Sequence, residues 1–201
     1  MLVPGFLNKT ACCALLAIML LMACSSNHVS SSRVVVLIPL GNFPQKNANQ
    51  LASELKKFHS KVILSKAQPF PKTAYNESRK RYRADKLIAY LKNFGNADTV
   101  ILGLSTFDIS TTKNQHADWG VMGLGYQPGA ACVISTWRLN KTNLQNQLLK
   151  VAVHELGHTQ GLPHCNVNSC YMRDAGGKNP HDEETGFCDK CKTYLNKQGW
   201  L

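Results

Sequence analysis

Apolar positions along the chain follow two patterns, continuous runs and runs spaced three or four residues apart. The continuous runs at 33–40 and 99–104 are rich in valine, isoleucine and leucine. The first predicts a central strand covered on both faces, and the second predicts another buried strand. The run at 62–64 predicts a short strand between them. Helical spacing predicts further elements over 44–60 and 76–93. The alternation of strands and helices predicts an α/β domain with a mixed, twisted sheet.

Residues 105–140 are rich in glycine and follow neither period. An exposed edge strand in this stretch could hydrogen-bond an extended peptide, because a sheet edge presents free backbone donors and acceptors. An ordinary hairpin explains the same residues. Asp108 and His116 are interpreted as loop groups, and Cys132, among apolar neighbours, as a buried free thiol.

Basic residues crowd the positions of the predicted helix 76–93 that its apolar face leaves free. They are Arg79, Lys80, Arg81, Arg83, Lys86 and Lys92. Such a cluster could face a membrane or an anion, but charges on a helix usually face water, and we interpret them as a solvated surface.

The N-terminal segment has the pattern of an export signal. Lys9 precedes an uninterrupted apolar run at 11–23, which is too short to span a bilayer and suits the hydrophobic part of a signal peptide. The closing residues Leu21-Met22-Ala23-Cys24 are similar to the lipobox of bacterial lipoproteins, which implies cleavage before Cys24 and lipid on that cysteine. An ordinary secretory signal or a short uncut anchor is the alternative.

We therefore divide the chain into a signal peptide over 1–23, the lipidated cysteine and a serine-rich flexible tether over 24–33, and one domain over 34–201. The 201 residues, 44% hydrophobic and 17% charged, suit a single globular domain. The net charge is +11, and +10 without Lys9. Because an exported protein meets little nucleic acid, anionic lipid or acidic peptides are the expected partners of this charge.

The chemistry concentrates on a predicted helix that begins at Thr142 or Asn143 and carries His154, Glu155 and His158. Two histidines four residues apart lie on one helix face and can reach the same ion. Beyond them, Gly161 can end the helix in a left-handed conformation and Pro163 prevents it from resuming. The chain then reverses, so that His164 can supply a third nitrogen.

Three neutral imidazoles leave one coordination position of a zinc ion open for water, which is typical of a catalytic rather than a structural site. The ion would lower the pKa of that water towards about 7 and polarise a carbonyl. Glu155 is placed to accept the proton of the water and pass it to a leaving amine. The pattern favours peptide hydrolysis.

This extended motif resembles the metzincin clan of zinc peptidases, and the residues after it narrow the resemblance to the archaemetzincin family. The further matching residues are Cys165, Cys170, Met172, Cys188 and Cys191. The resemblance covers most of 33–195 and implies a metzincin-like zincin fold with an active-site helix and a small C-terminal subdomain. Two features depart from the family: a spacer of 15 residues between Met172 and Cys188, shorter than expected, and the lipoprotein signal.

The resemblance implies a role for each matching residue. His154, His158 and His164 would bind a catalytic zinc ion, with Glu155 as the general base, and Met172 would lie in the turn beneath that zinc. The four cysteines Cys165, Cys170, Cys188 and Cys191 would bind a second, structural zinc. Two disulfides are the rival interpretation, because an exported chain meets an oxidising compartment; the Cys-x-x-Cys spacing favours zinc.

Other polar residues near the motif carry weaker signals. Tyr126, Tyr171 and Arg173 are candidates for stabilising the oxyanion by their position in the sequence only. The acidic run at 182–184 could bind a cation, but we interpret it, together with His181, as part of a solvated loop.

These observations predict a zinc-dependent metallopeptidase, with aminopeptidase character implied by some members of the family. We expect a monomer that acts on peptides or proteins, binds no nucleic acid and is lipid-anchored in a bacterial cell envelope. The alternative is a non-catalytic envelope lipoprotein that binds zinc or a peptide, which would have no need of Glu155. A weaker alternative is an adhesion module that uses the basic surface.

Overall fold

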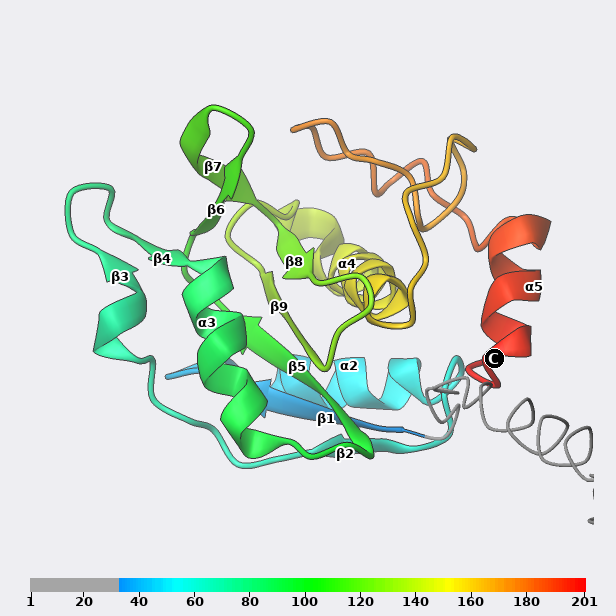
Figure 1. Cartoon of the computed structure of the whole chain (residues 1–201), viewed down its shortest axis with the longest axis horizontal. Helices are drawn as coiled ribbons and strands as arrows, with labels where there is room; N and C mark the ends of the chain where they lie inside the picture. The colour runs from blue at the N-terminus through cyan, green and yellow to red at the C-terminus, as the bar shows by residue number, and fades with distance from the viewer. Residues whose placement is uncertain (1–32) are drawn as a thin grey trace, which may run out of the picture.

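The computed structural model describes residues 33–201, so the predicted signal peptide, Cys24 and most of the tether lie outside the described residues. A five-stranded sheet with the order β2-β1-β5-β9-β8 forms the centre of the domain (Figure 1). Its strands are β1 (Val34–Pro39), β2 (Val62–Leu64), β5 (Thr99–Ser105), β8 (Gly123–Gly125) and β9 (Ala131–Ser135). All neighbours are parallel except β8, which runs antiparallel to β9 along one edge.

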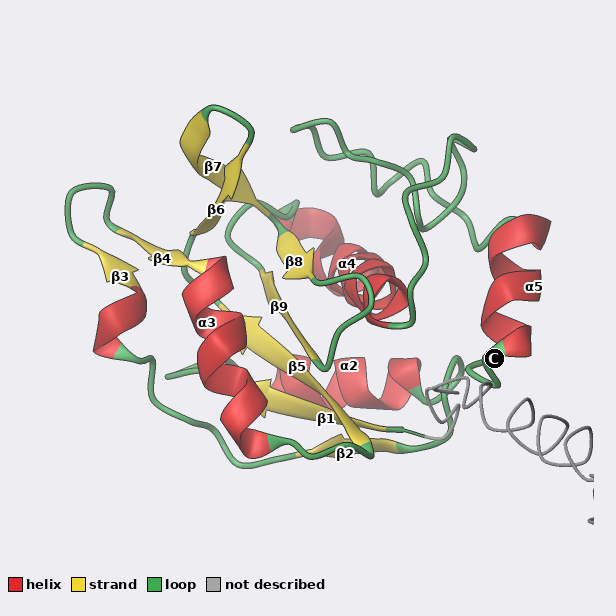
Figure 2. Ribbon diagram, in the orientation of Figure 1, coloured by secondary structure: helices red, strands yellow, loops and turns green. Residues whose placement is uncertain are grey.

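Helices cover both faces of this sheet, as the continuous apolar runs predict (Figure 2). α2 (Gln45–Leu55) and α4 (Leu144–Thr159) pack on one face, and α3 (Ala84–Leu91) packs on the other. Alternate residues of β1 serve the two cores: Val35 and Leu37 face α2 and α4, and Ile38 faces α3. The three predicted strands and the βαβ unit are confirmed, and β1 is a central strand as predicted, since it pairs with β2 on one side and with β5 on the other.

A second, four-stranded sheet lies beside the first, with the order β3-β4-β6-β7. Its strands are β3 (Tyr75–Asn76), β4 (Arg81–Arg83), β6 (Ile109–Lys113) and β7 (His116–Val121). Short 3-10 turns join the larger elements at η1 (Lys72–Ala74), η2 (Lys92–Phe94) and η3 (Lys141–Asn143). The predicted loop group His116 is thus an exposed residue at the start of β7.

The prediction of a helix over 76–93 is wrong in its first half, because α3 begins only at Ala84. Tyr82 explains the difference: its ring stacks on Phe70 with centroids 4.3 Å apart, and its backbone N–H donates to the carbonyl of Asp108. These contacts join residues distant in the sequence and hold Tyr82 in an extended strand. Tertiary packing therefore overrides the local helical spacing.

The interpretation of the basic cluster as a solvated helix face is also wrong for Arg81 and Arg83, which lie in β4 and are mostly covered, whereas Arg79 is exposed. Arg79 Nε lies 2.9 Å from Asp118 Oδ2, and Arg81 Nε lies 3.3 Å from Asp108 Oδ2. Asp108 lies in the loop between β5 and β6, as predicted, and also accepts two hydrogen bonds, of 2.8 and 3.0 Å, from Arg138. These ion pairs connect the second sheet to the segment that follows β9.

The C-terminal part of the domain is a long irregular segment followed by α5 (Asp189–Lys197). Leu195 and Trp200 of this part are buried in the same core as α2 and α4. Cys132 is a buried free thiol, as predicted. Within residues 33–201, no helix is both long and apolar enough to cross a bilayer. The fold is the predicted α/β arrangement, with an active-site helix and a small C-terminal part.

Candidate active site

The helix α4 carries the first two histidines because its apolar stripe buries it against the sheet. Leu148, Val151 and Leu156 are at most 2% exposed, and His154 and His158 are each 9% exposed. The predicted capping differs in detail. The side chain of Asn140 accepts a hydrogen bond from the Thr142 N–H and caps the preceding 3-10 turn, whereas Asn143 lies at the N-cap of α4 without a side-chain hydrogen bond.

The turn after α4 brings the third histidine to the other two. Gly161 has φ of +96°, the left-handed conformation that its sequence position predicts. The ring centroid of His164 lies 5.3 Å from that of His154 and 4.8 Å from that of His158. Nitrogen atoms of all three rings lie within 4.8 Å of one another, so the structure brings together the three predicted ligands.

Hydrogen bonds set the tautomers of the two buried histidines. His154 Nδ1 lies 2.7 Å from the carbonyl oxygen of Tyr171, and His158 Nδ1 lies 2.7 Å from that of Leu162. Because a carbonyl oxygen can only accept, each Nδ1 carries the proton of the neutral ring and each Nε2 presents a lone pair. Burial, with the neighbouring His158, lowers the pKa of His154 to about 3, so this ring is neutral at physiological pH.

The two Nε2 atoms, of His154 and His158, are 3.1 Å apart. Two lone pairs facing each other at this distance repel unless a cation lies between them. Two nitrogens bound to one tetrahedral zinc ion at about 2.1 Å are about 3.4 Å apart. The donor set and its spacing therefore fit zinc.

Glu155 is on the same helix, and its carboxyl group lies against the edge strand β8. It is 6% exposed, and burial raises its pKa to about 8 despite a hydrogen bond from the backbone of Gly125. A carboxyl group whose pKa lies near neutral pH is suited to accept and release a proton at ordinary pH. Gly123 makes room for it, since a Cβ there would lie 2.5 Å from Glu155 Oε1.

Met172 lies directly against the active-site helix. It is fully buried, and a Cβ on Gly157 would lie 2.6 Å from its sulfur. The glycine between the two histidines thus allows the methionine to approach the helix backbone.

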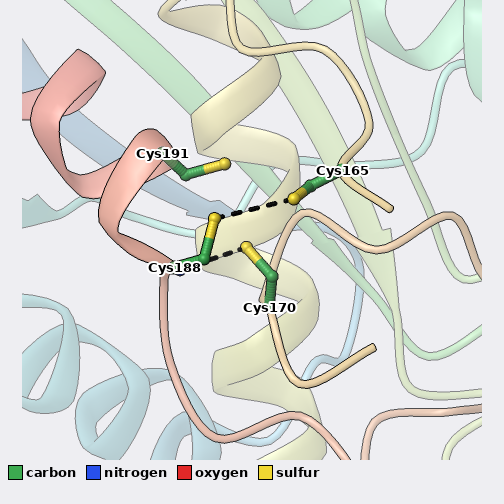
Figure 3. A group of neighbouring side chains, drawn as sticks. All are labelled: Cys165, Cys170, Cys188 and Cys191. Carbon is green, nitrogen blue, oxygen red and sulfur yellow. Dashed lines mark hydrogen bonds between the residues drawn. The ribbon is translucent and has the colours of Figure 1, made fainter. Parts of the chain in front are cut away.

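The four cysteines also meet, and Figure 3 shows their sulfur atoms turned towards one another. All four sulfurs lie within 4.8 Å of one another, with Cys165 Sγ 3.6 Å from Cys188 Sγ. Sulfurs bound to one tetrahedral zinc at about 2.3 Å are about 3.8 Å apart, whereas a disulfide requires about 2.05 Å. Among the described residues all cysteines are free, so the geometry favours the metal interpretation.

Burial raises the pKa of Cys170 and Cys191 in the metal-free protein, whereas hydrogen bonds favour the thiolate of Cys188. Cys170 Sγ accepts hydrogen bonds from the backbone N–H groups of Met172 and Cys188. Burial raises the pKa of Cys188, but hydrogen bonds from the backbone of Cys191 and from Cys165 outweigh it and lower that pKa to about 7. Two cysteines come from the loop after α4 and two from the start of α5, so a bound ion would join these segments.

A cavity of about 670 Å³ opens over the three histidines and Glu155. β8, the second sheet and the segment 173–181 surround it. Of the candidates for the oxyanion, Tyr126 and Arg173 line this cavity and the ring of Tyr171 does not. Tyr171 instead packs against Phe58 and Phe187.

Sequence reasoning missed one cluster, because the interpretation of His181 and the acidic run as a solvated loop is wrong for two of these residues. His181 is 4% exposed and Glu184 is 1% exposed. Lys150, one helical turn before His154, is buried and donates to the backbone carbonyls of both. A lysine inside the apolar stretch of α4 is the signal that could have indicated a buried polar cluster.

Comparison with known proteins gives one consistent result. Residues 49–197 match the model of peptidase family M54. The archaemetzincin of Halobacterium salinarum is 30% identical over 172 residues, which are 79% of this chain and 96% of that protein. The archaemetzincin of Archaeoglobus fulgidus is 32% identical over 150 residues, which are 72% of this chain and 88% of that protein.

Solved structures agree. The archaemetzincin of Archaeoglobus fulgidus, in complex with malonate, superposes with a TM-score of 0.68 at 28% identity, covering 80% of this chain and 99% of that one. The Methanopyrus kandleri archaemetzincin has the same fold, with a TM-score of 0.71 at 24% identity, covering 83% of this chain and 96% of that one. From the motif, the fold and these relatives, this chain belongs to peptidase family M54, the archaemetzincin family of zinc metallopeptidases.

Proposed function

We propose that this metallopeptidase hydrolyses peptide bonds with His154, His158 and His164 as ligands of a catalytic zinc ion and Glu155 as the general base. The observation that carries the proposal is the pair of Nε2 lone pairs 3.1 Å apart, beside a buried carboxyl group in a cavity. Zinc, when bound, supplies a Lewis acid that polarises the scissile carbonyl and makes water easier to deprotonate.

Glu155 moves the proton in this scheme. It accepts a proton from the attacking water as the water oxygen bonds to the carbonyl carbon, and the carbonyl oxygen takes the negative charge. When the C–N bond breaks and the carbonyl re-forms, Glu155 returns the proton to the leaving amine. A pKa of about 8 in the metal-free protein supports this role, because a group near neutrality can act in both directions.

The edge strand β8 is the proposed binding surface for the substrate. It pairs with β9 on one side only and lines the cavity beside Glu155. Its outer edge can hydrogen-bond an extended peptide, which would then cross the three histidines. We also propose aminopeptidase-like trimming, which predicts faster cleavage of a peptide with a free N-terminus than of its acetylated form.

We propose two zinc ions per chain, the second held by Cys165, Cys170, Cys188 and Cys191. We also propose that the protein is a monomer anchored in a bacterial cell envelope by lipid on Cys24. The net charge of +11 supports a location next to anionic lipid.

Glu155→Gln provides the central experiment. The isosteric amide cannot accept a proton, so we expect kcat on a peptide library to fall about 10³-fold while both zinc ions remain bound. Metal content, measured by mass spectrometry of the purified protein, separates lost chemistry from lost metal. If wild type and variant are equally inert with zinc bound, the non-catalytic zinc- or peptide-binding lipoprotein becomes the better description.

A further inference from the structure

The proposed reaction places negative charge on the carbonyl oxygen, and a side chain that donates a hydrogen bond there would stabilise it. The candidates from the sequence do not suit this role. Tyr171 packs away from the cavity, and Arg173 is held by Glu183 Oε2 at 2.5 Å. Tyr126 is 43% exposed and lies beneath the ammonium group of Lys92.

His181 has the features that these candidates lack. His181 lines the cavity that holds His154 and Glu155, and it is 4% exposed. Its Nε2 is buried and has no hydrogen-bond partner among the described residues. A buried polar atom left unpaired costs free energy, and such atoms in native proteins often have a functional partner that is absent.

Glu184 orients this ring. Its Oε2 lies 2.9 Å from His181 Nδ1, so the carboxylate holds one nitrogen of the imidazole and leaves the other free. Lys150 fixes the backbone of both residues by donating hydrogen bonds of 2.6 Å to the carbonyl oxygens of His181 and Glu184. An oriented imidazole next to a carboxylate, held by the active-site helix itself, is a preorganised catalytic group.

His181 lines the same cavity as the three histidines proposed to bind zinc. The pKa of His154 is lowered mainly by burial, and the charge of His181 contributes to this shift. An imidazole that carries protons on both nitrogens can donate from both, through Nδ1 to Glu184 and through Nε2 to a substrate atom. The charged groups that face it are Glu184 and Lys150.

We propose that His181 is a catalytic residue whose Nε2–H donates a hydrogen bond to the carbonyl oxygen of the scissile peptide, with Glu184 as its positioning residue. The bond strengthens as the oxygen gains charge in the tetrahedral state. No proton is transferred by His181, since the proton of the water still travels through Glu155 to the amine. This inference rests on the proposed peptidase function.

The experiment compares wild type with His181→Phe and His181→Gln. A peptide substrate and a phosphinate peptide, whose tetrahedral oxyanion mimics the hydrolytic transition state, are the probes. For His181→Phe we expect kcat to fall about 100-fold with KM nearly unchanged, and phosphinate affinity to fall by a similar factor. Affinity for the amine product, the C-terminal fragment, which carries no oxyanion at the cleaved bond, should stay constant.

The remaining variants define the role. His181→Gln keeps a donor and should recover part of the loss, whereas Glu184→Gln should cost about tenfold because the ring is less firmly held. His116→Phe, at an exposed histidine on β7, is the matched control and should behave as wild type.

Three outcomes would overturn the assignment: equal phosphinate affinity in His181→Phe and wild type, a parallel loss of product affinity, or loss of zinc in both His181 variants. The last result would mean that His181 supports the metal site. If wild type itself neither cleaves peptides nor binds the phosphinate, the proposed function fails, which is a separate result.

Discussion

Gly123 and Glu155 are in contact across the space between β8 and α4, and this contact decides which residue β8 can carry. A Cβ at position 123 would lie 2.5 Å from Glu155 Oε1 and 2.6 Å from its Cγ. Gly123→Ala must therefore displace the carboxyl group while leaving the three histidines in place.

We expect Gly123→Ala to lower kcat at least tenfold without loss of zinc, because the general base moves relative to the attacking water. Steady-state kinetics with metal analysis measure this. Gly186→Ala is the control, since a Cβ there meets nothing within 4 Å. Equal losses in both variants would contradict a local effect on Glu155.

Glu155 also makes the stability of the metal-free protein depend on pH. Burial raises its pKa from 4.5 to about 8, so the folded state holds the proton more tightly than the unfolded chain does. The stability from this group is present below about pH 4.5 and is lost as pH rises through about 8. His154 acts in the opposite sense, because its lowered pKa costs stability as pH falls below 6.5.

Glu155→Gln isolates the first effect, because both proteins keep His154. In the presence of a chelator, we expect the variant to gain on the order of 3 kcal/mol over wild type between about pH 5 and pH 8.5. Denaturant unfolding at the two pH values measures the gain. A difference between the two proteins that does not change with pH would show that the carboxyl group is not buried in solution.

At the scale of elements, the four-cysteine cluster connects the end of α4 to α5. Cys165 directly follows His164, so the two proposed metal sites share a short piece of backbone. The Tyr194 hydroxyl of α5 also donates to the Gln160 carbonyl at the end of α4. A zinc ion bound by the four cysteines would join the two segments more strongly than this single hydrogen bond.

Cys188→Ser should reduce the zinc content from two ions to one and lower the free energy of unfolding by roughly 3 kcal/mol or more. Metal analysis and thermal unfolding measure the two effects. Cys132→Ala is the control, because Cys132 is buried outside the cluster and should leave the metal content unchanged. Wild-type protein with one zinc ion and no titratable thiols in the cluster would instead favour disulfides.

At the scale of the whole molecule, the described chain begins next to the catalytic helix. Arg33 donates through Nη1 to the carbonyl of Gly129 and through Nη2 to that of Thr159, both at 3.0 Å. A guanidinium at the C-terminal end of α4 is favourable for the helix dipole. The segment that we propose as a tether therefore joins the domain beside the end of its active-site helix.

The proposed anchor predicts a change in location. In a bacterial host, Cys24→Ser should abolish incorporation of labelled fatty acid and release the protein from the membrane fraction, with peptidase activity of the purified domain unchanged. Labelling and fractionation measure the outcome. A variant that stays in the membrane without lipid would point to an uncut anchor, and an unlabelled wild type to an ordinary secretory signal.

The sequence by itself determined the interior strands, the active-site helix and the two groups of proposed metal ligands. These features depend on short spacings: the four residues from His154 to His158, the left-handed turn at Gly161 and the continuous apolar run of β1. Local backbone geometry converts such spacings directly into shared faces.

Only the tertiary structure decided the extended conformation of Tyr82 and the ion pair of Asp108 with Arg138. The same holds for the buried hydrogen bond between His181 and Glu184. The first two depend on partners from distant segments, 30 residues apart in the case of Asp108 and Arg138. His181 and Glu184 are close in sequence, but Lys150, more than 30 residues away, fixes their buried arrangement. Polar residues look alike in a sequence whether they face water or a partner, because the difference in free energy arises only when the partner is brought to them.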